Sequence, residues 1–269
     1  MSNRSHSIIS HRKETAVLAL MGVILLLTGT YAGVGWSAYL HDFHSVFPTA
    51  AGYARTILCA TMVLFIGVRD NVTRRDKRLL LAAFGLTLVA DFFLILLDWM
   101  MTGTVIFLGV HAIFIVRHVR GFQDSLNLAV RARTIRRLVV SGLVAYGGSA
   151  ILLYCVAPLL RKHGQLTIDC IYIFALATSL WTAWGTLFRR AFPSFNAWLI
   201  ALGMTCFYFC DVSVGLAAPL SGTHAGGILN NLVGFFYTPA LVLLALSGFR
   251  FRSDGDSTRM IAPEGRETA

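Results

Sequence analysis

Four ionisable residues lie inside long apolar stretches of this sequence: Arg55, Asp91, His111 and Asp211. Two carboxyl groups, an imidazole and a guanidinium can perform acid–base chemistry in a medium of low dielectric constant. Burial keeps one carboxyl protonated there, while a nearby cation keeps the other ionised. Such a pair supports hydrolysis through an oxocarbenium-like state that water captures. It equally supports a proton relay in a transporter, and the spacing of the four residues does not choose between the two.

The composition places these residues in a membrane. Of the 269 residues, 56% are apolar and 13% are charged, and the mean hydropathy is +0.68. A soluble domain carries about 25% charged residues, so the composition excludes a soluble enzyme or a nucleic-acid-binding domain. A helix of about 20 apolar residues spans the hydrocarbon layer. Eight stretches meet this requirement: Thr15–Leu40, Thr49–Val68, Leu79–Leu97, Met100–Val116, Leu138–Leu160, Thr167–Phe188, Asn196–Pro219 and Gly227–Phe249.

The basic residues orient these eight spans. Twenty of the 23 Lys and Arg residues fall on one side, only Arg161 and Lys162 fall on the other, and Arg55 lies within a span. Cytoplasmic loops carry the excess of positive charge. We therefore predict an all-α fold, a polytopic membrane bundle of eight transmembrane helices with both termini cytoplasmic. The predicted domains are a cytoplasmic tail over 1–14, a transmembrane domain over 15–249 and a second cytoplasmic tail over 250–269.

The ends of the chain and its loops suggest no further domain. The first apolar stretch is long enough to span and lacks a clear cleavage site, so it is interpreted as a signal anchor. The basic loops orient the protein and contact anionic lipid head groups. They lack the interleaved aromatic residues that nucleic-acid binding favours, so no nucleic-acid partner is expected.

The four intramembrane residues share one depth. At 1.5 Å per residue, the distance to the outer boundary is about 12 Å for Asp91, about 8–10 Å for Asp211, about 10 Å for Arg55 and about 12–15 Å for His111. Singly, each has a structural explanation, such as a head-group contact, a buried hydrogen bond or an ion pair. Together, their common depth favours a shared polar cavity just outside the midplane.

The five cysteines indicate no metal site. Cys59, Cys206 and Cys210 lie in apolar stretches and are interpreted as small packing residues. Cys155 and Cys170 flank a short outer loop, where a disulfide could form. There is no C-x-x-C motif and no zinc-like spacing, so we expect neither a metal nor a cofactor.

The charged residues recur in a recognisable order. The stretches read Y-A-R-T-I-L around Arg55, F-G-L-T-L-V-A-D-F-F-L around Asp91, F-L-G-V-H-A-I-F from Phe107, F-Y-F-C-D-V at Asp211 and N-L-V-G-F-F-Y-T-P-A-L around Tyr237. In this order, spans two to eight resemble the YhhN or lysoplasmalogenase-like integral membrane proteins, which have eight spans. Where that family has Pro, Gly, Tyr and Ser, this chain has Thr56, Ala90, Phe114 and Cys210.

The resemblance implies hydrolysis of the vinyl ether bond of a lysoplasmalogen, a single-chain phospholipid, to a fatty aldehyde and a glycerophospho-alcohol. Asp91 and Asp211 would then be the acid and base, in either order, and His111 would orient one of them or the water. Arg55 would hold the ionised carboxylate or the substrate phosphate. Further candidates for the substrate pocket are Tyr237, Tyr208, Asn230, Asn231 and Asp98, the last at the outer mouth on the same helix face as Asp91.

Other functions stay open at this point. The same buried charges would serve a proton-coupled transporter or a lipid carrier, or the chain could be an inactive membrane scaffold of this fold. A zinc-dependent hydrolase of the ceramidase type would need several intramembrane histidines, whereas only His111 lies deep in a span. The short loops and the resemblance indicate a multi-pass protein of a bacterial plasma membrane. The sequence carries no signal for an oligomeric state.

Overall fold

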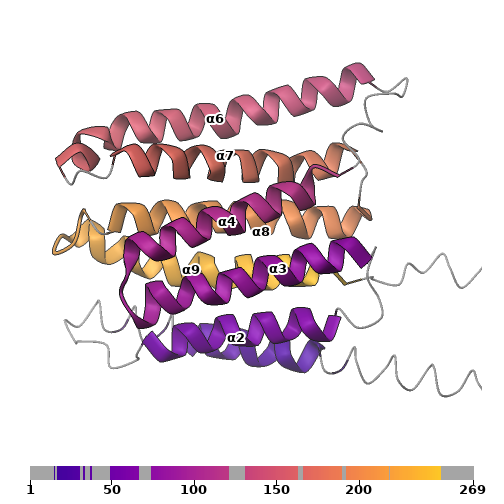
Figure 1. The fold of residues 1–269 in the computed structure, drawn as a ribbon, viewed down its shortest axis with the longest axis horizontal. Coiled ribbons are helices and arrows are strands. Elements are labelled where there is room, and N and C mark those ends of the chain that lie inside the picture. The colour runs from indigo at the N-terminus through magenta and orange to yellow at the C-terminus, as the bar shows by residue number, and fades with distance from the viewer. Residues whose placement is uncertain are drawn as a thin grey trace, which may run out of the picture.

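The structure, a computed structural model, is a bundle of long helices that run roughly side by side (Figure 1). No strand occurs among the residues that it describes, which confirms the all-α prediction. These residues are Thr15, 17–30, 33, 37, 49–66, 74–120, 131–162, 166–189, 192–217 and 219–249. The two predicted tails, 1–14 and 250–269, lie outside the described residues.

The helices follow one another in chain order. A first apolar helical segment covers Val17–Thr30. The elements after it are α2 (Thr49–Ile66), α3 (Arg74–Asp91), the π-helical turn η1 (Phe92–Leu96), α4 (Met100–His118), α6 (Arg131–Lys162), α7 (Leu166–Arg189), α8 (Ser194–Ala217) and α9 (His224–Leu246).

Six helices are long and apolar enough to cross a membrane. They are Arg74–Leu96, Met100–His118, Ala132–Pro158, Thr167–Arg189, Ser194–Ala217 and His224–Leu246. These six match the predicted third to eighth spans. In place of the first two spans the described residues contain the shorter apolar helices Val17–Thr30 and Gly52–Leu64. The chain is therefore a helical membrane bundle, while the full count of eight spans and the orientation of the termini stay predictions.

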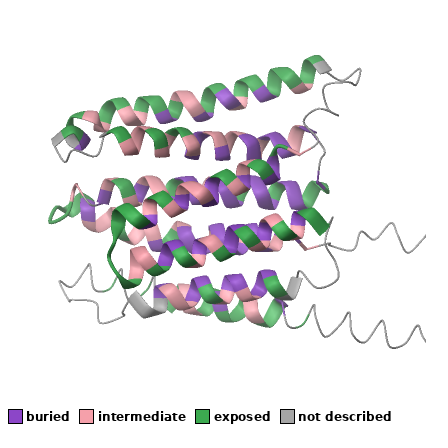
Figure 2. Ribbon diagram, viewed as in Figure 1, coloured by how far each residue is buried: buried purple, intermediate pink, exposed green. Residues whose placement is uncertain are grey.

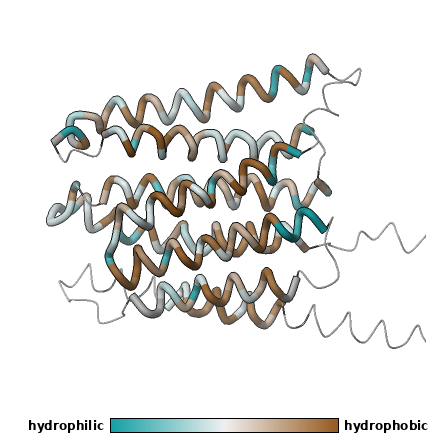
Figure 3. Tube along the Cα trace, in the orientation of Figure 1, coloured by the Kyte–Doolittle hydropathy of each residue, from teal (hydrophilic) through white to brown (hydrophobic). Residues whose placement is uncertain are grey.

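Several helices extend beyond the predicted spans at one end of the bundle. Helix α3 begins at Arg74 instead of Leu79, and α6 begins at Arg131 instead of Leu138. Figure 3 shows hydrophilic turns of α3 and α6 at the same end of the bundle, on the right of the view. Apolar length locates the part of a helix that lies in lipid, but a polar helical turn can continue beyond it.

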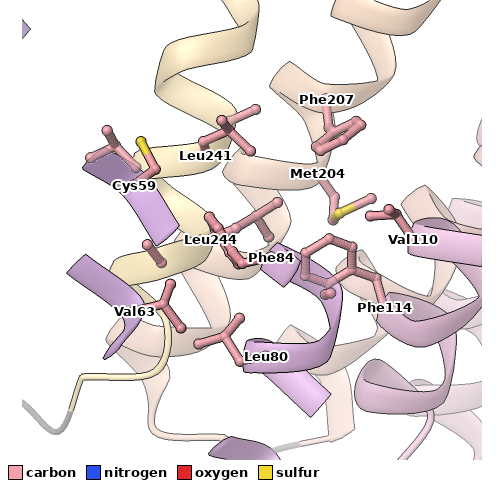
Figure 4. Packing of buried hydrophobic residues seen from close by; sticks show 14 of the residues in the cluster. Cys59, Val63, Leu80, Phe84, Val110, Phe114, Met204, Phe207, Leu241 and Leu244 are labelled. Carbon is pink, nitrogen blue, oxygen red and sulfur yellow. The ribbon is translucent and has the colours of Figure 1, made fainter. Parts of the chain in front are cut away.

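The hydrophobic core lies among α2, α3, α4, α8 and α9. Figure 4 shows Cys59, Phe84, Val110, Phe207 and Leu241, one side chain from each of these helices, in this cluster. No described residue of α6 belongs to the cluster, and most of the surface of α6 is exposed or half-buried (Figure 2). In a membrane this exposed apolar surface faces lipid. A core without α6 therefore positions the residues described below.

The cysteines make no disulfide in the described part of the chain. Cys155 is exposed and Cys170 is half-buried, and both are free thiols in the structure. Cys59 and Cys210 are buried in the core, as predicted for packing residues, and Cys206 is half-buried.

The connection between α3 and α4 has an irregular backbone. The amide of Leu97 donates to the carbonyl of Phe92, five residues earlier, at 3.2 Å, as a π-helical turn requires. Asp98 follows with φ of +55°. Gly103 of α4 lies so close to Leu94 that an added Cβ atom would overlap its side chain. Asp91 thus ends α3 at the point where the helical geometry changes.

A cluster of buried polar side chains, the Arg117 cluster, closes the bundle at the end where α3 begins. Its members are Asp76, Arg117, Asn196 and Ser247. Arg117 donates from Nε and Nη2 to the two carboxylate oxygens of Asp76, at 3.0 and 3.1 Å, and from Nη1 to the Ser247 hydroxyl at 2.8 Å. The count of basic residues assigned Arg117 to a cytoplasmic loop, but this side chain is fully buried.

Candidate active site

Asp91 is held by side chains from two other helices. It is 2% exposed and is the last residue of α3. Its Oδ2 atom accepts hydrogen bonds from the Thr56 hydroxyl of α2 and from the Tyr237 hydroxyl of α9, each at 2.5 Å. One carboxylate oxygen therefore joins α2, α3 and α9.

Asp211 of α8 is held in the same manner. Its Oδ2 atom accepts from the Tyr172 hydroxyl of α7 at 2.6 Å and from His111 Nε2 of α4 at 2.9 Å. A carboxylate only accepts hydrogen bonds, so the facing ring nitrogen is assigned as the N–H donor. The His111 side chain is fully buried, and that of Asp211 is 9% exposed.

A phenylalanine lies between these two groups. The ring of Phe207 contacts the imidazole of His111 edge to face at 5.2 Å between centroids, and the ring of Tyr237 at 6.1 Å. The charges of Asp91, Asp211 and Arg55 are also near enough to interact. The two carboxylates therefore belong to one site, which we call the aspartate site. Its members are Thr56, Asp91, His111, Tyr172, Asp211 and Tyr237.

Each carboxylate of the aspartate site has one anchored oxygen and one available oxygen. All hydrogen bonds to Asp91 and Asp211 from the described residues reach Oδ2. Within that part of the chain, neither Oδ1 atom accepts a bond. Two donors on Oδ2 restrict rotation of the carboxylate, so Oδ1 also keeps one position. This is the arrangement that acid–base chemistry needs.

Arg55 lies beside Asp91 with its guanidinium buried. The side chain is 4% exposed, and Nη1 donates to the Thr238 hydroxyl of α9 at 3.0 Å. A Cβ atom added at Gly52 would lie 3.6 Å from Arg55 Nη2 and 3.9 Å from Ile95 of η1. The guanidinium therefore extends from the aspartate site toward the start of α2 and the side of η1.

The structure separates the predicted site residues into two sets. It brings together Arg55, Asp91, His111, Asp211 and Tyr237. Tyr208 instead contacts α6, where its hydroxyl is 2.8 Å from the Ser149 hydroxyl. Three others make no hydrogen bond to the aspartate site within the described residues: exposed Asn230, half-buried Asn231 and exposed Asp98.

Three hydroxyl residues escaped the sequence analysis: Thr56 and Tyr172 of the aspartate site, and Thr238, which accepts from Arg55. Thr56 follows Arg55 and Thr238 follows Tyr237, so proximity along the chain to a selected residue was an available signal. Tyr172 had no such signal, because no ionisable candidate was assigned to its span.

The described residues contain no group of three or more His, Cys, Asp or Glu side chains that could hold a metal ion. The donor set of the aspartate site consists of hydroxyl, imidazole and carboxylate groups. These groups suit proton transfer by side chains of the chain itself.

The fold and the site define a class: a polytopic helical membrane protein with paired, anchored aspartates within its bundle. A family model then names the family, because the YhhN model matches residues 49–248, from the start of α2 to just beyond the end of α9. This chain belongs to the YhhN family. No curated protein and no solved structure matches it.

Proposed function

We propose that this chain is a membrane-embedded hydrolase that cleaves the vinyl ether bond of a lysoplasmalogen or a related lysolipid. The observation that carries the proposal is the pair of aspartates, each with one oxygen anchored and the other held available. Two such oxygens can supply one proton donor and one proton acceptor. The interpretation of this fold as lysoplasmalogenase-like supports the choice of substrate.

The reaction can proceed with the two aspartates alone. One carboxylic acid transfers its proton to the vinyl carbon distant from the ether oxygen, which gives an oxocarbenium ion. The other carboxylate removes a proton from water as the water oxygen bonds to the cationic carbon, and this forms a hemiacetal. The hemiacetal then gives its hydroxyl proton to the first carboxylate as its bond to the glycerol oxygen breaks, and the second carboxyl group protonates that oxygen, which restores both aspartates. A fatty aldehyde and a glycerophospho-alcohol result, and one water molecule is consumed.

Arg55 is suited to the phosphate of such a substrate. A guanidinium binds phosphate with two parallel hydrogen bonds, and the bond to Thr238 orients it. In this proposal the single alkenyl chain lies among the apolar helices and the head group extends from Arg55 toward η1. The substrate would reach the site from the bilayer, in the plasma membrane of a bacterium.

The test is aldehyde release by the purified protein in detergent. Lysoplasmalogen should yield fatty aldehyde, whereas the matched lysolipid with a saturated ether should yield none, because it lacks the vinyl carbon that accepts the proton. Asp91→Asn and Asp211→Asn should each lower the rate at least about 1,000-fold while the protein stays folded.

Failure to release aldehyde from any vinyl ether lysolipid would overturn the hydrolase. The same carboxylates, linked through hydroxyls and His111, would also suit a proton relay. Substrate flux into proteoliposomes that depends on a proton gradient would then assign a transporter. If the protein shows neither hydrolysis nor flux, the remaining assignment is a membrane scaffold of this fold.

A further inference from the structure

Tyr172 is the one member of the aspartate site that comes from α7, a helix with no residue in the predicted site. We propose that Tyr172 is a positioning residue that fixes the orientation of the Asp211 carboxylate during catalysis. The proposal rests on the proposed hydrolase function, which it deepens by assigning a role to α7.

The geometry ties Tyr172 to both members of the Asp211–His111 pair. Its hydroxyl donates to Asp211 Oδ2 at 2.6 Å and lies 3.4 Å from His111 Nε2. The tyrosine ring also packs edge to face against the imidazole, at 5.6 Å between centroids. His111 alone would leave the carboxylate free to rotate about its Cβ–Cγ bond. The second donor removes that freedom, so Oδ1 keeps one position.

The fold does not need this hydroxyl to hold α7 in place. The buried residues of α7 begin at Leu176, and no residue from Thr167 to Ala175 is buried. The second half of the helix is secured by Trp181, which donates to the Leu138 carbonyl at 2.8 Å, and by Arg189, which donates to the backbone carbonyl of His118 at 2.9 Å. Tyr172 thus lies on the loosely packed half, where its hydroxyl contacts only the site.

Exposure distinguishes Tyr172 from the corresponding tyrosine at Asp91. Tyr237 is buried at 7% exposure, whereas Tyr172 is half-buried, and the Asp211 side chain is 9% exposed. Asp91, His111 and Thr56 are buried as well. Tyr172 and Asp211 therefore form the side of the aspartate site that is nearest to the surface of the bundle. A tyrosine here can hold Asp211 in its catalytic orientation at the point where substrate and water arrive.

The kinetic test compares two tyrosine-to-phenylalanine changes in the full-length protein. Tyr172→Phe removes only the hydroxyl and should lower kcat for aldehyde release about 10- to 100-fold, with KM changed less than about twofold. Tyr146→Phe is the matched control, because its hydroxyl is 2.8 Å from that of Thr178 in α7, away from the site. This control should leave both constants near their wild-type values. Incorporation of 4-aminophenylalanine at position 172 restores an N–H donor and should recover part of kcat.

Three results would overturn the positioning role: wild-type kcat in Tyr172→Phe, an equal loss in Tyr146→Phe, or a loss that appears in KM alone. Thermal unfolding of each variant in detergent separates a folding defect from these outcomes.

A second readout does not depend on hydrolysis. In protein labelled with 13C-aspartate, the carboxylate stretching band of Asp211 is identified in the infrared difference between wild type and Asp211→Asn. Tyr172→Phe should shift this band, and Tyr146→Phe should not. An unshifted band would refute the positioning role even in an active enzyme. Conversely, a shifted band in a protein that releases no aldehyde would reject the proposed function and leave the Tyr172–Asp211 bond established.

Discussion

Two groups of buried polar side chains in the described part of the bundle differ in how completely their hydrogen bonds are satisfied. In the Arg117 cluster, both oxygens of Asp76 accept from Arg117, and the Ser247 carbonyl accepts from Asn196 at 2.8 Å. In the aspartate site, each carboxylate uses Oδ2 for two donors and keeps Oδ1 free of bonds from the described residues. Buried aspartates thus belong to a closed group in one place and to an open group in the other.

This difference separates structural roles from chemical ones. A buried ion pair whose hydrogen bonds are all made can only hold helices together, and loss of one partner leaves a costly charge. A carboxylate with an available oxygen can still exchange a proton. We therefore expect changes in the Arg117 cluster to reduce stability and changes in the aspartate site to reduce activity.

The largest expected effect is on stability. Asp76→Asn leaves the guanidinium of Arg117 buried without its carboxylate, and the free energy of unfolding should fall by about 3–5 kcal/mol. Denaturant unfolding in detergent measures this change. Asp169→Asn is the control, since Asp169 is a half-buried aspartate of α7. Unchanged unfolding of Asp76→Asn would contradict the structural role of the cluster.

Loss of the cation beside Asp91 should weaken substrate binding. Arg55→Gln should raise KM for lysoplasmalogen about 30-fold, or about 2 kcal/mol, because a phosphate loses a charged partner. Steady-state kinetics measure the constant, with Arg74→Gln, an exposed arginine at the start of α3, as the control. A loss confined to kcat would instead show that Arg55 acts on the carboxylate.

Ser247→Ala should reduce stability without reducing activity. It removes the acceptor of Arg117 Nη1, and the free energy of unfolding should fall by about 1.5 kcal/mol, as for a hydrogen bond to a charged group. Ser213→Ala provides the comparison, because the Ser213 hydroxyl donates to the Phe209 carbonyl within its own helix. A drop in kcat of the folded Ser247→Ala protein would show that the two groups are coupled.

The smallest expected effect is a fall in kcat when the anchoring of Asp91 is weakened. Thr56→Val keeps the shape of the side chain but removes one of two donors to Oδ2, and kcat should fall about fivefold, or about 1 kcal/mol. Thr61→Val on the same helix removes a hydroxyl that donates only to the Ile57 carbonyl, and it should have no such effect. Equal rates for the two variants would show that Tyr237 alone fixes Asp91.

The sequence predicted the bundle and the ionisable members of the site for different physical reasons. Apolar length identifies a membrane helix, so the third to eighth spans are confirmed as helices. A charge in lipid is costly, so Asp91, His111 and Asp211 stood out from their surroundings. Hydroxyl groups cost little in a helix, where they can donate to a carbonyl of the preceding turn. Thr56 therefore had no signal beyond its place next to Arg55. Tyr172, an aromatic residue in an apolar stretch, had none, and only its contacts reveal it.

Burial also reversed one interpretation. Arg117 and Arg189 were counted with the basic loops, since both stand at the ends of apolar stretches. In the structure Arg117 pairs with Asp76, and Arg189 donates to backbone carbonyls of His118 and Thr182. A count of positive charge orients a chain, but it does not show which cations have carbonyl or carboxylate partners.

The length of α6 has a consequence for how the bilayer acts on this protein. Its 32 residues correspond to about 48 Å of helix, against about 30 Å of hydrocarbon. A helix longer than the layer tilts or extends beyond it, and the amount depends on membrane thickness. Helix α6 lies outside the core and packs mainly on α7. A change in bilayer thickness would therefore first alter the tilt of α6, and it would reach Asp211 through α7 and Tyr172.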